Sequence, residues 1–195
     1  MPVFAITGVY SSGKTVLLNF LKRKGAVVFD ADKRIHGYYR DKGHRVYKRV
    51  SESFPQSVRG GRICRKSLGK IVFKDIGQLR RLERIVHPEI IKDLLSWVKE
   101  CRGKEGVFVA EVPLLFEKGL DKHFDGVILV KVKKQTAAER IIKANGCSKD
   151  EALSRLALFA PLGAKIKKAD YIIDNDSGKK EFRVLAEALW NKLIG

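Results

Sequence analysis

Eight residues near the start of the chain have the types and the spacing that hold the phosphates of a nucleotide. In the stretch 8–15, Gly8, Gly13, Lys14 and Thr15 fit the pattern G-x-x-x-x-G-K-[ST]. Glycine lets the backbone turn tightly, so that N–H groups and the positive end of the next helix can face phosphate oxygens. Lys14 would lie on the terminal phosphates, and the Thr15 hydroxyl on the magnesium ion that bridges them. The pattern predicts an ATP-binding phosphate loop, and an ordinary strand-to-helix turn is the competing interpretation.

The residues that flank this loop predict the elements that position it. The apolar run 3–6 precedes the loop as a strand, and residues 16–21 follow with apolar side chains at helical spacing. Cations and a glycine at 22–25 mark the end of that helix. Because strand, loop and helix come in the expected order, we expect ATP contacts from the rest of the loop as well, namely from Tyr10, Ser11 and Ser12.

Two carboxylates follow the next predicted strand, at 26–29. Asp30 and Asp32 come at its carboxyl end, which is where open α/β sheets place their ligands. If the backbone is still extended there, both side chains point to one side, and a carboxylate could accept a proton from an attacking hydroxyl. Asp is also a common helix cap. We expect one of the pair to cap or position and the other to act in the reaction.

Strand character returns in three later runs. The run 106–112 carries Glu111 near its carboxyl end, where phosphate-loop enzymes keep an acid directed at the magnesium ion through its waters. The runs 127–132 and 171–173 are the next two predicted strands. Helical patterns separate the strands, so the sequence predicts an α/β fold with a mostly parallel sheet of about five strands.

The segment 33–104 is too long for a simple connection and reads as a helical insertion. Asp75 can cap one helix in it, and Pro88 is expected to open another. The stretch 60–65 reads as a loop whose Arg65 could grip a phosphate, although a lone arginine is more often a solvated surface residue.

A second helical segment lies at 135–164. A helix from Thr136 is expected to end near Gly146, and a capping box from Ser148 begins a second helix that runs to Pro161. This basic hairpin could close over the nucleotide as a lid, with Arg140 or Arg155 on the transferred phosphoryl group, or its charges could simply be solvated. The terminal helix carries an apolar stripe expected in the core: Phe182, Leu185, Leu189 and Leu193.

Composition bounds the class of protein. The 195 residues suit a single domain with insertions, and 45% hydrophobic residues argue against disorder. The chain has no apolar run long enough to span a bilayer, and its N-terminus does not resemble a secretory signal. Its three cysteines have no paired spacing. We therefore expect a cytoplasmic protein that does not bind a membrane. The net charge of +18 attracts polyanions, which include both nucleic acids and phosphorylated small molecules. No aromatic-and-basic stacking motif supports specific nucleic-acid binding.

Taken together, the motifs resemble those of the dephospho-coenzyme A kinase family, also named CoaE, over nearly the whole chain. The matching stretches are 5–8 with 12–15, 30–32, 65–68 with 71–73, 82–83 with 87–88, 113–117, Gln135 with Arg140, 169–170 and 173–175. A phosphate loop alone indicates only a superfamily, whereas this ordered set is far more specific.

The resemblance implies transfer of the ATP γ-phosphoryl group to the ribose 3′-hydroxyl of dephospho-coenzyme A, with magnesium. It implies a three-layer phosphate-loop kinase fold, divided into a core (about 1–32, 105–134 and 165–195), an acceptor-binding insertion (33–104) and a lid (135–164). In this reading Asp32 deprotonates the hydroxyl, while Lys14 and Arg140 act on the phosphates. ATP would also contact Asn175. The acceptor substrate would contact these residues: Asp32, Arg65, His87, Pro113, Leu114, Leu115 and Glu117. His87 before a proline could equally be a structural residue at a helix start.

The chain departs from the family pattern in several places. Its phosphate loop has Val9 and Ser11 where glycine is usual, and Cys64 replaces an aspartate before Arg65. In the lid, Ala144 replaces a second arginine and Phe159 a glutamine. These departures concern lid contacts more than the reaction, because the phosphate loop and Asp32 are intact.

Two other functions stay open at this stage. The acceptor could be another small hydroxyl compound such as a nucleoside, or the protein could be a nucleotide-dependent nucleic-acid-binding protein. We expect a monomer, with an oligomer left open.

Overall fold

The computed structural model describes residues 2–72, 75–157 and 161–195. The chain forms two compact units. The first, which we call the sheet unit, consists of Met1–Phe29 and Val98–Gly195. The second, the helical unit, consists of Asp30–Trp97.

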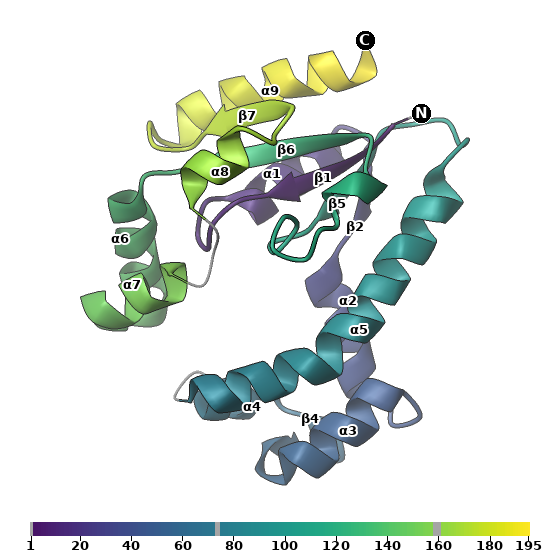
Figure 1. Cartoon of the computed structure of the whole chain (residues 1–195), viewed down its shortest axis with the longest axis vertical. Helices are drawn as coiled ribbons and strands as arrows, with labels where there is room; N and C mark the ends of the chain where they lie inside the picture. Colours follow the sequence, from purple (N-terminus) through teal and green to yellow (C-terminus); the bar gives the residue numbers. More distant parts are fainter. Residues whose placement is uncertain (1, 73–74, 158–160) are drawn as a thin grey trace. The chain divides into compact units, whose positions relative to one another are not determined.

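Five strands of the sheet unit form one sheet within the described residues (Figure 1). Each neighbouring pair is parallel, and the order is β2-β5-β1-β6-β7. The predicted α/β fold with a parallel sheet of about five strands is confirmed. The strands are β1 Val3–Thr7, β2 Val27–Phe29, β5 Phe108–Glu111, β6 Gly126–Lys131 and β7 Tyr171–Asp174.

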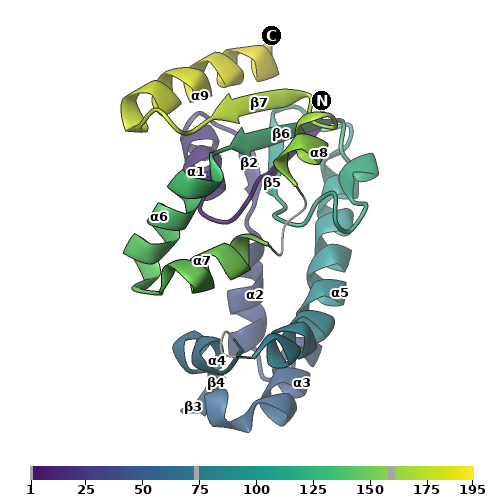
Figure 2. The ribbon, with the colours of Figure 1, turned by 60° about the vertical axis from the view of Figure 1, so that its left-hand side comes forward.

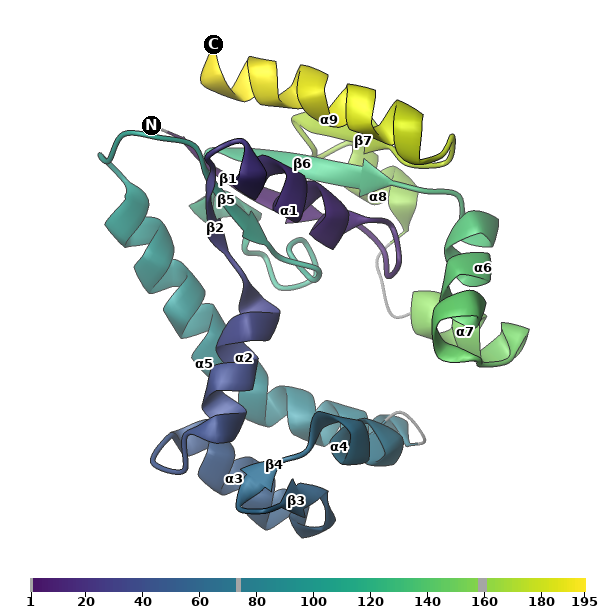
Figure 3. The same cartoon turned by 180° about the vertical axis from the view of Figure 1, so that it is seen from behind.

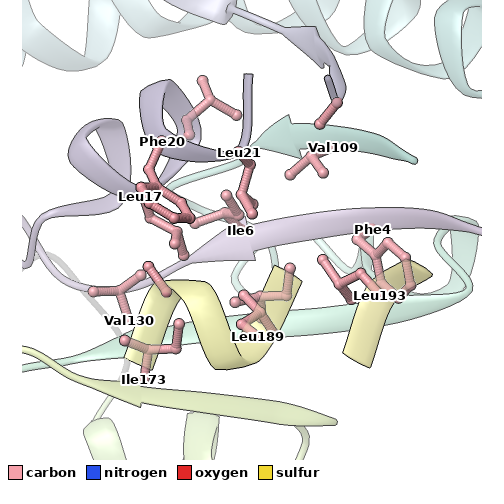
Figure 4. Packing of buried hydrophobic residues seen from close by; sticks show 14 of the residues in the cluster. Phe4, Ile6, Leu17, Phe20, Leu21, Val109, Val130, Ile173, Leu189 and Leu193 are labelled. Carbon is pink, nitrogen blue, oxygen red and sulfur yellow. The ribbon is translucent and has the colours of Figure 1, made fainter. Parts of the chain in front are cut away.

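Helices α1 (Lys14–Arg23) and α9 (Lys179–Ile194) cover one face of this sheet (Figure 3). Their apolar side chains and those of the strands form one buried cluster, which Figure 4 shows. Leu17 of α1 and Leu189 of α9 belong to this cluster together with strand residues such as Ile6. The predicted stripe of α9 is right for Phe182, Leu189 and Leu193. It is wrong for Leu185, which is 41% exposed, because Ala186 takes the buried position.

Strand β2 is less buried than its apolar sequence indicates. A strand was predicted at 26–29, and its apolar sequence is typical of a parallel strand covered on both faces, yet Val27 is 47% exposed. The reason is its place in the sheet: β2 is an edge strand that pairs only with β5.

The remaining helices of the sheet unit follow β6. Helices α6 (Lys134–Asn145) and α7 (Lys149–Leu156) form a hairpin that Figure 2 shows in green. The predicted capping box is present, since the Ser148 hydroxyl accepts from the Glu151 N–H and the Glu151 carboxylate accepts from the Ser148 N–H. A short helix, α8 (Leu162–Ile166), then packs on β6.

The helical unit contains one feature that the sequence did not indicate. The stretch 60–65 was expected to be a loop. Instead, Arg62–Ile63 pairs antiparallel with Val58–Arg59, and Arg65 is the first residue of a helix. Gly60 and Gly61 form the turn between the two strands at φ 55° and 71°, values that glycine adopts without strain. The elements of this unit are α2 Ala31–Arg40, α3 Arg45–Ser53, a 3₁₀ turn Pro55–Ser57, β3 Val58–Arg59, β4 Arg62–Ile63, α4 Arg65–Val72 and the start of α5.

Helix α5 (Ile76–Cys101) runs through Pro88 without a break, so the expectation that this proline begins a new helix is wrong. An internal proline costs roughly 3 kcal/mol because a backbone hydrogen bond is lost. Buried apolar residues on both sides of it, including Val86 and Ile90, offset that cost at about 2 kcal/mol each.

Across 2–72, 75–157 and 161–195, no helix is both long enough and apolar enough to cross a bilayer. The functional division of the chain into core, acceptor-binding insertion and lid stays a prediction.

Candidate active site

The candidate residues of the sheet unit come together because parallel strands end at one edge. The phosphate loop follows β1, Glu111 ends β5, α6 follows β6, and Asn175 follows β7. The register places Ile6 of β1 opposite Glu111, which brings the start of the loop beside that carboxylate. This edge is where α/β folds bind ligands.

The glycines of the phosphate loop lie where a side chain has no room. A Cβ on Gly8 would come within 2.5 Å of the Val130 carbonyl oxygen and 2.7 Å of the Ser12 hydroxyl. A Cβ on Gly13, which has φ 102°, would fall on the amide nitrogen of Asn175. The loop backbone therefore lies tight against its neighbours, as a phosphate cradle requires.

Ser11 is the exception in this loop. It has φ 59°, the one positive value among non-glycine residues of the described chain. This conformation is strained for an L-residue with a Cβ. Glycine adopts this conformation without that strain.

Two polar side chains of the loop are buried. Lys14 is 7% exposed and its ammonium donates to the Val9 carbonyl oxygen at 2.9 Å. The Ser12 hydroxyl is fully buried and has no hydrogen-bond partner among the residues that the structure describes. A buried hydroxyl without a partner, beside a helix N-terminus and a lysine, fits a loop built to receive phosphate oxygens.

Thr15 and Glu111 supply oxygen ligands at the end of the loop. The Thr15 hydroxyl donates to Glu111 Oε1 at 3.2 Å. Hydroxyl and carboxylate oxygens suit Mg²⁺, which keeps several waters and takes its remaining ligands from phosphates. No cluster of three or more His, Cys, Asp or Glu that could hold a metal exists in the described parts of the chain. The Thr15 hydroxyl and the Glu111 carboxylate fit a magnesium ion whose other ligands are phosphates and water.

Asn175 and Arg140 hold the phosphate loop from outside. The Asn175 side-chain amide donates to the Ser12 carbonyl oxygen at 2.7 Å, and Asn175 is 9% exposed. Arg140 of α6 donates to the Asn175 carbonyl oxygen at 2.7 Å and to the Ser11 carbonyl oxygen at 3.5 Å. Both residues were expected to contact ATP directly; in this structure their hydrogen bonds go to the loop that would hold it.

Charged neighbours fix the turn that carries Asn175. Lys131 at the end of β6 pairs with Asp174 at the end of β7 at 2.7 Å. This hydrogen bond lowers the pKa of the Asp174 carboxyl and raises the pKa of the Lys131 ammonium. The Asp176 carboxylate accepts from the Lys133 N–H at 2.9 Å, directly before α6. The turn is thus joined to the helix that carries Arg140.

The other lid residues lie on the hairpin itself. Arg155 is half-buried on α7, and Ala144 lies in the last turn of α6. Phe159, one of the predicted departures from the family pattern, lies outside the described residues, as does Phe73.

The predicted acceptor-side turn 113–117 follows β5. The Thr7 hydroxyl donates to the Pro113 carbonyl oxygen at 3.3 Å, and the Leu115 side chain is fully buried. Glu117 pairs with Lys165 of α8 at 2.8 Å. Neither Thr7 nor Lys165 was predicted, because a threonine ending a strand and one lysine among 40 basic residues carry no local signal.

In the helical unit, the two aspartates have different positions. Asp30 is the N-cap of α2, and its carboxylate accepts from the Lys33 N–H at 2.9 Å. The backbone is already helical at Asp32, so the alternating extended arrangement of the two side chains is wrong. The expectation that one of the pair caps is confirmed for Asp30, and Asp32 is exposed in the first turn.

The charges of Asp32 and Arg65 both act on the hydroxyl of the buried Tyr39. Burial raises the pKa of Tyr39 to about 12, while the Arg65 charge lowers this pKa and the Asp32 charge raises it further. Asp32 and Arg65 are thus brought to one part of the helical unit, on the first turns of α2 and α4. A cation and a carboxylate that act on the same group suit a substrate that carries both phosphate and hydroxyl groups.

His87 and Cys64 complete the candidates of this unit. His87 lies within α5, so its alternative role at a helix start is wrong. Cys64 directly precedes α4, and a hydrogen bond with Ser67 lowers the pKa of its thiol.

Comparison with known proteins adds to this geometry. The family model "CoaE: Dephospho-CoA kinase" matches residues 2–181. The dephospho-CoA kinase of Aquifex aeolicus is 38% identical over 93% of this chain and 92% of its own length. The crystal structure of TT1252 from Thermus thermophilus is 30% identical, with a TM-score of 0.73 over 100% of this chain and 99% of that one. A dephospho-CoA kinase structure from Campylobacter jejuni shares the fold at 24% identity, with a TM-score of 0.69 over 98% and 97% of the two chains.

Proposed function

This chain belongs to the dephospho-CoA kinase family, and we propose that it transfers the γ-phosphoryl group of ATP to the ribose 3′-hydroxyl of dephospho-CoA. The products are coenzyme A and ADP. The observation that carries the proposal is the family match over residues 2–181, in a chain whose phosphate loop has the buried Lys14 and the unpartnered Ser12 hydroxyl described above.

In this proposal the sheet unit holds the donor. Backbone N–H groups of the loop and Lys14 bind the β- and γ-phosphates, and Thr15 with Glu111 positions the metal site. A bound magnesium ion supplies positive charge that offsets the charge of the phosphates in the transition state. Arg140 and Asn175 keep the loop in its phosphate-binding shape, because their hydrogen bonds end on the Ser11 and Ser12 carbonyl oxygens.

In the same proposal the acceptor hydroxyl is deprotonated by Asp32. Its carboxylate is exposed on α2, so it can meet a hydroxyl without a change in its own helix. Arg65 binds a phosphate of the acceptor, and His87 with the turn 113–117 contacts the rest of that substrate. The proton passes from the 3′-hydroxyl to the carboxylate as the oxygen attacks phosphorus.

An acceptor panel tests this function. The purified protein is given ATP, magnesium and, separately, dephospho-CoA, adenosine or another nucleoside, and kcat/KM is compared. We expect the highest kcat/KM for dephospho-CoA. A nucleoside that exceeds it would replace the proposed acceptor, and a protein that turns over none of them would not be this kinase.

The high positive charge motivates one competing function, nucleic-acid binding. Nonspecific attraction of this kind weakens steeply with salt. Tight nucleic-acid binding that persists at physiological salt would favour it, whereas binding that is lost there supports charge used for anionic small substrates.

Two further expectations belong to the proposal. The widely spaced cysteines, which are free thiols here, support a location in the reducing cytoplasm. We also expect the enzyme to act as a monomer, which its mass in solution would test.

A further inference from the structure

Lys165 is the one lysine of the described chain with no exposed surface at all. Its relative exposure is 0%, and its side chain lies on α8, a helix of five residues that packs on β6. An ammonium group is costly to remove from water unless a carboxylate neutralises it. Lys165 meets that requirement through Glu117, whose carboxylate lies 2.8 Å from its ammonium nitrogen.

Lys165 and Glu117 differ in whether a substrate can contact them. The Glu117 side chain is 18% exposed, whereas Lys165 is closed off from solvent. A ligand can therefore contact the carboxylate but not the lysine. Lys165 can thus act on a substrate through the position and charge of Glu117.

The turn that carries Glu117 is held at both ends. At its start, the Thr7 hydroxyl donates to the Pro113 carbonyl oxygen, and in its middle Leu115 is fully buried. At its end, α8 and the residues after it make two contacts: Lys165 with Glu117, and the Lys168 ammonium over the Phe116 ring at 5.6 Å from its centre.

We propose that Lys165 is a positioning residue for the acceptor substrate, which acts by holding the Glu117 carboxylate in place. The inference rests on the proposed function, in which the turn 113–117 contacts dephospho-CoA. It extends that function to a residue of α8 that touches no substrate. It also joins the acceptor-side turn to the segment that directly follows the lid hairpin in the chain.

Kinetics of matched variants test the proposal. Lys165→Met removes the charge and keeps much of the apolar stem, and Lys165→Gln keeps a hydrogen-bond donor in case the first variant folds poorly. Lys167→Met is the control, because Lys167 loses the same charge from an exposed position two residues away. Glu117→Gln and the double variant Glu117→Gln/Lys165→Met complete the cycle.

We expect Lys165→Met to raise the KM for dephospho-CoA about tenfold. This is the effect expected when the displaced Glu117 carboxylate no longer makes one charge-assisted hydrogen bond to the substrate. The KM for ATP should stay within about twofold, and Lys167→Met should match the wild type. Because the two residues act as one unit, the double variant should be no worse than the worse single variant.

A purely structural role would give a different result. Variants of Lys165 that melt at a lower temperature but keep both KM values would overturn the proposal, and so would an equal rise in the KM of both substrates. If Glu117→Gln keeps the acceptor KM while the wild type makes coenzyme A, this inference is wrong and the proposed function stands. If the wild type makes no coenzyme A, the proposed function itself is wrong, and the inference goes with it.

Discussion

The Thr15 hydroxyl donates to the Glu111 carboxylate at 3.2 Å, although 96 residues separate the two in the chain. The parallel pairing of β1 with β5 creates this relationship, since it sets Ile6 opposite Glu111. Thr15 is the second residue of α1, the helix that begins at the end of the phosphate loop, so the carboxylate is held directly beside the residue assigned to magnesium.

Glu111→Gln should therefore affect the metal more than either substrate. The variant keeps the shape of the side chain and a hydrogen-bonding oxygen but loses its charge. We expect kcat to fall about 10- to 100-fold, the range seen when a residue that supports a metal ligand is lost, and the magnesium concentration for half-maximal rate to rise. Rates measured over a magnesium titration check this. Thr15→Ser, which keeps the hydroxyl, serves as the control and should remain within a few-fold of the wild type.

Asn175→Ala should weaken ATP binding without touching the acceptor. Removal of the amide leaves the Ser12 carbonyl without the hydrogen bond that now holds it at 2.7 Å, a loss worth about 1–3 kcal/mol. We expect the KM for ATP to rise about tenfold at an unchanged KM for dephospho-CoA. Ser177→Ala, an exposed position two residues away, is the matched control. An unchanged KM for ATP in Asn175→Ala would show that the loop keeps its shape without this brace.

Ser11→Gly should stabilise the protein. Ser11 has φ 59°, and an L-residue in this region costs about 1–2 kcal/mol relative to glycine, part of which is offset by the greater freedom of glycine in the unfolded chain. We expect a gain of about 1 kcal/mol in the free energy of unfolding, measured by denaturant titration. Ser154→Gly is a control in which a loss of stability is expected, because it places glycine at an exposed position inside α7 and should cost about 0.5 kcal/mol. A destabilised Ser11→Gly variant would mean that the serine side chain contributes more than its strain costs.

Substitutions of Asp30, the N-cap of α2, and of Asp32, in its first turn, should have different effects, the first on stability and the second on catalysis. Asp30→Ala removes the cap of α2 and should lower the free energy of unfolding by about 1 kcal/mol while turnover changes little. Asp32→Asn leaves the cap intact and should lower kcat about 100-fold or more, because general-base assistance is lost. Thermal melting and steady-state rates on both variants check this. Turnover of Asp32→Asn within a few-fold of the wild type would remove Asp32 as the base.

Features set by local sequence were the ones that could be predicted. The phosphate loop, the capping box at Ser148 and the strands of the sheet each depend on residues within a few positions of one another. The likeness to dephospho-CoA kinases, which rested on the order of such motifs, is confirmed by the family match.

Features set by distant residues could not be predicted in this way. The continuation of α5 through Pro88 depends on apolar burial beyond its own turn. The burial of Lys165 depends on Glu117, 48 residues earlier in the chain, and nothing in its neighbouring residues distinguishes it from an exposed lysine. Arg140 was assigned to a phosphate, while its hydrogen bonds end on backbone carbonyl oxygens that only the fold brings within reach.

The most direct test of the proposed function follows the phosphorus atom. Folded protein is incubated with magnesium, ATP and dephospho-CoA, and the products are followed by phosphorus NMR. We predict a new 3′-phosphomonoester signal that appears in equal amount with ADP and only when dephospho-CoA is present. ADP formed at the same rate without the acceptor, or no new phosphomonoester from folded protein, would contradict the account.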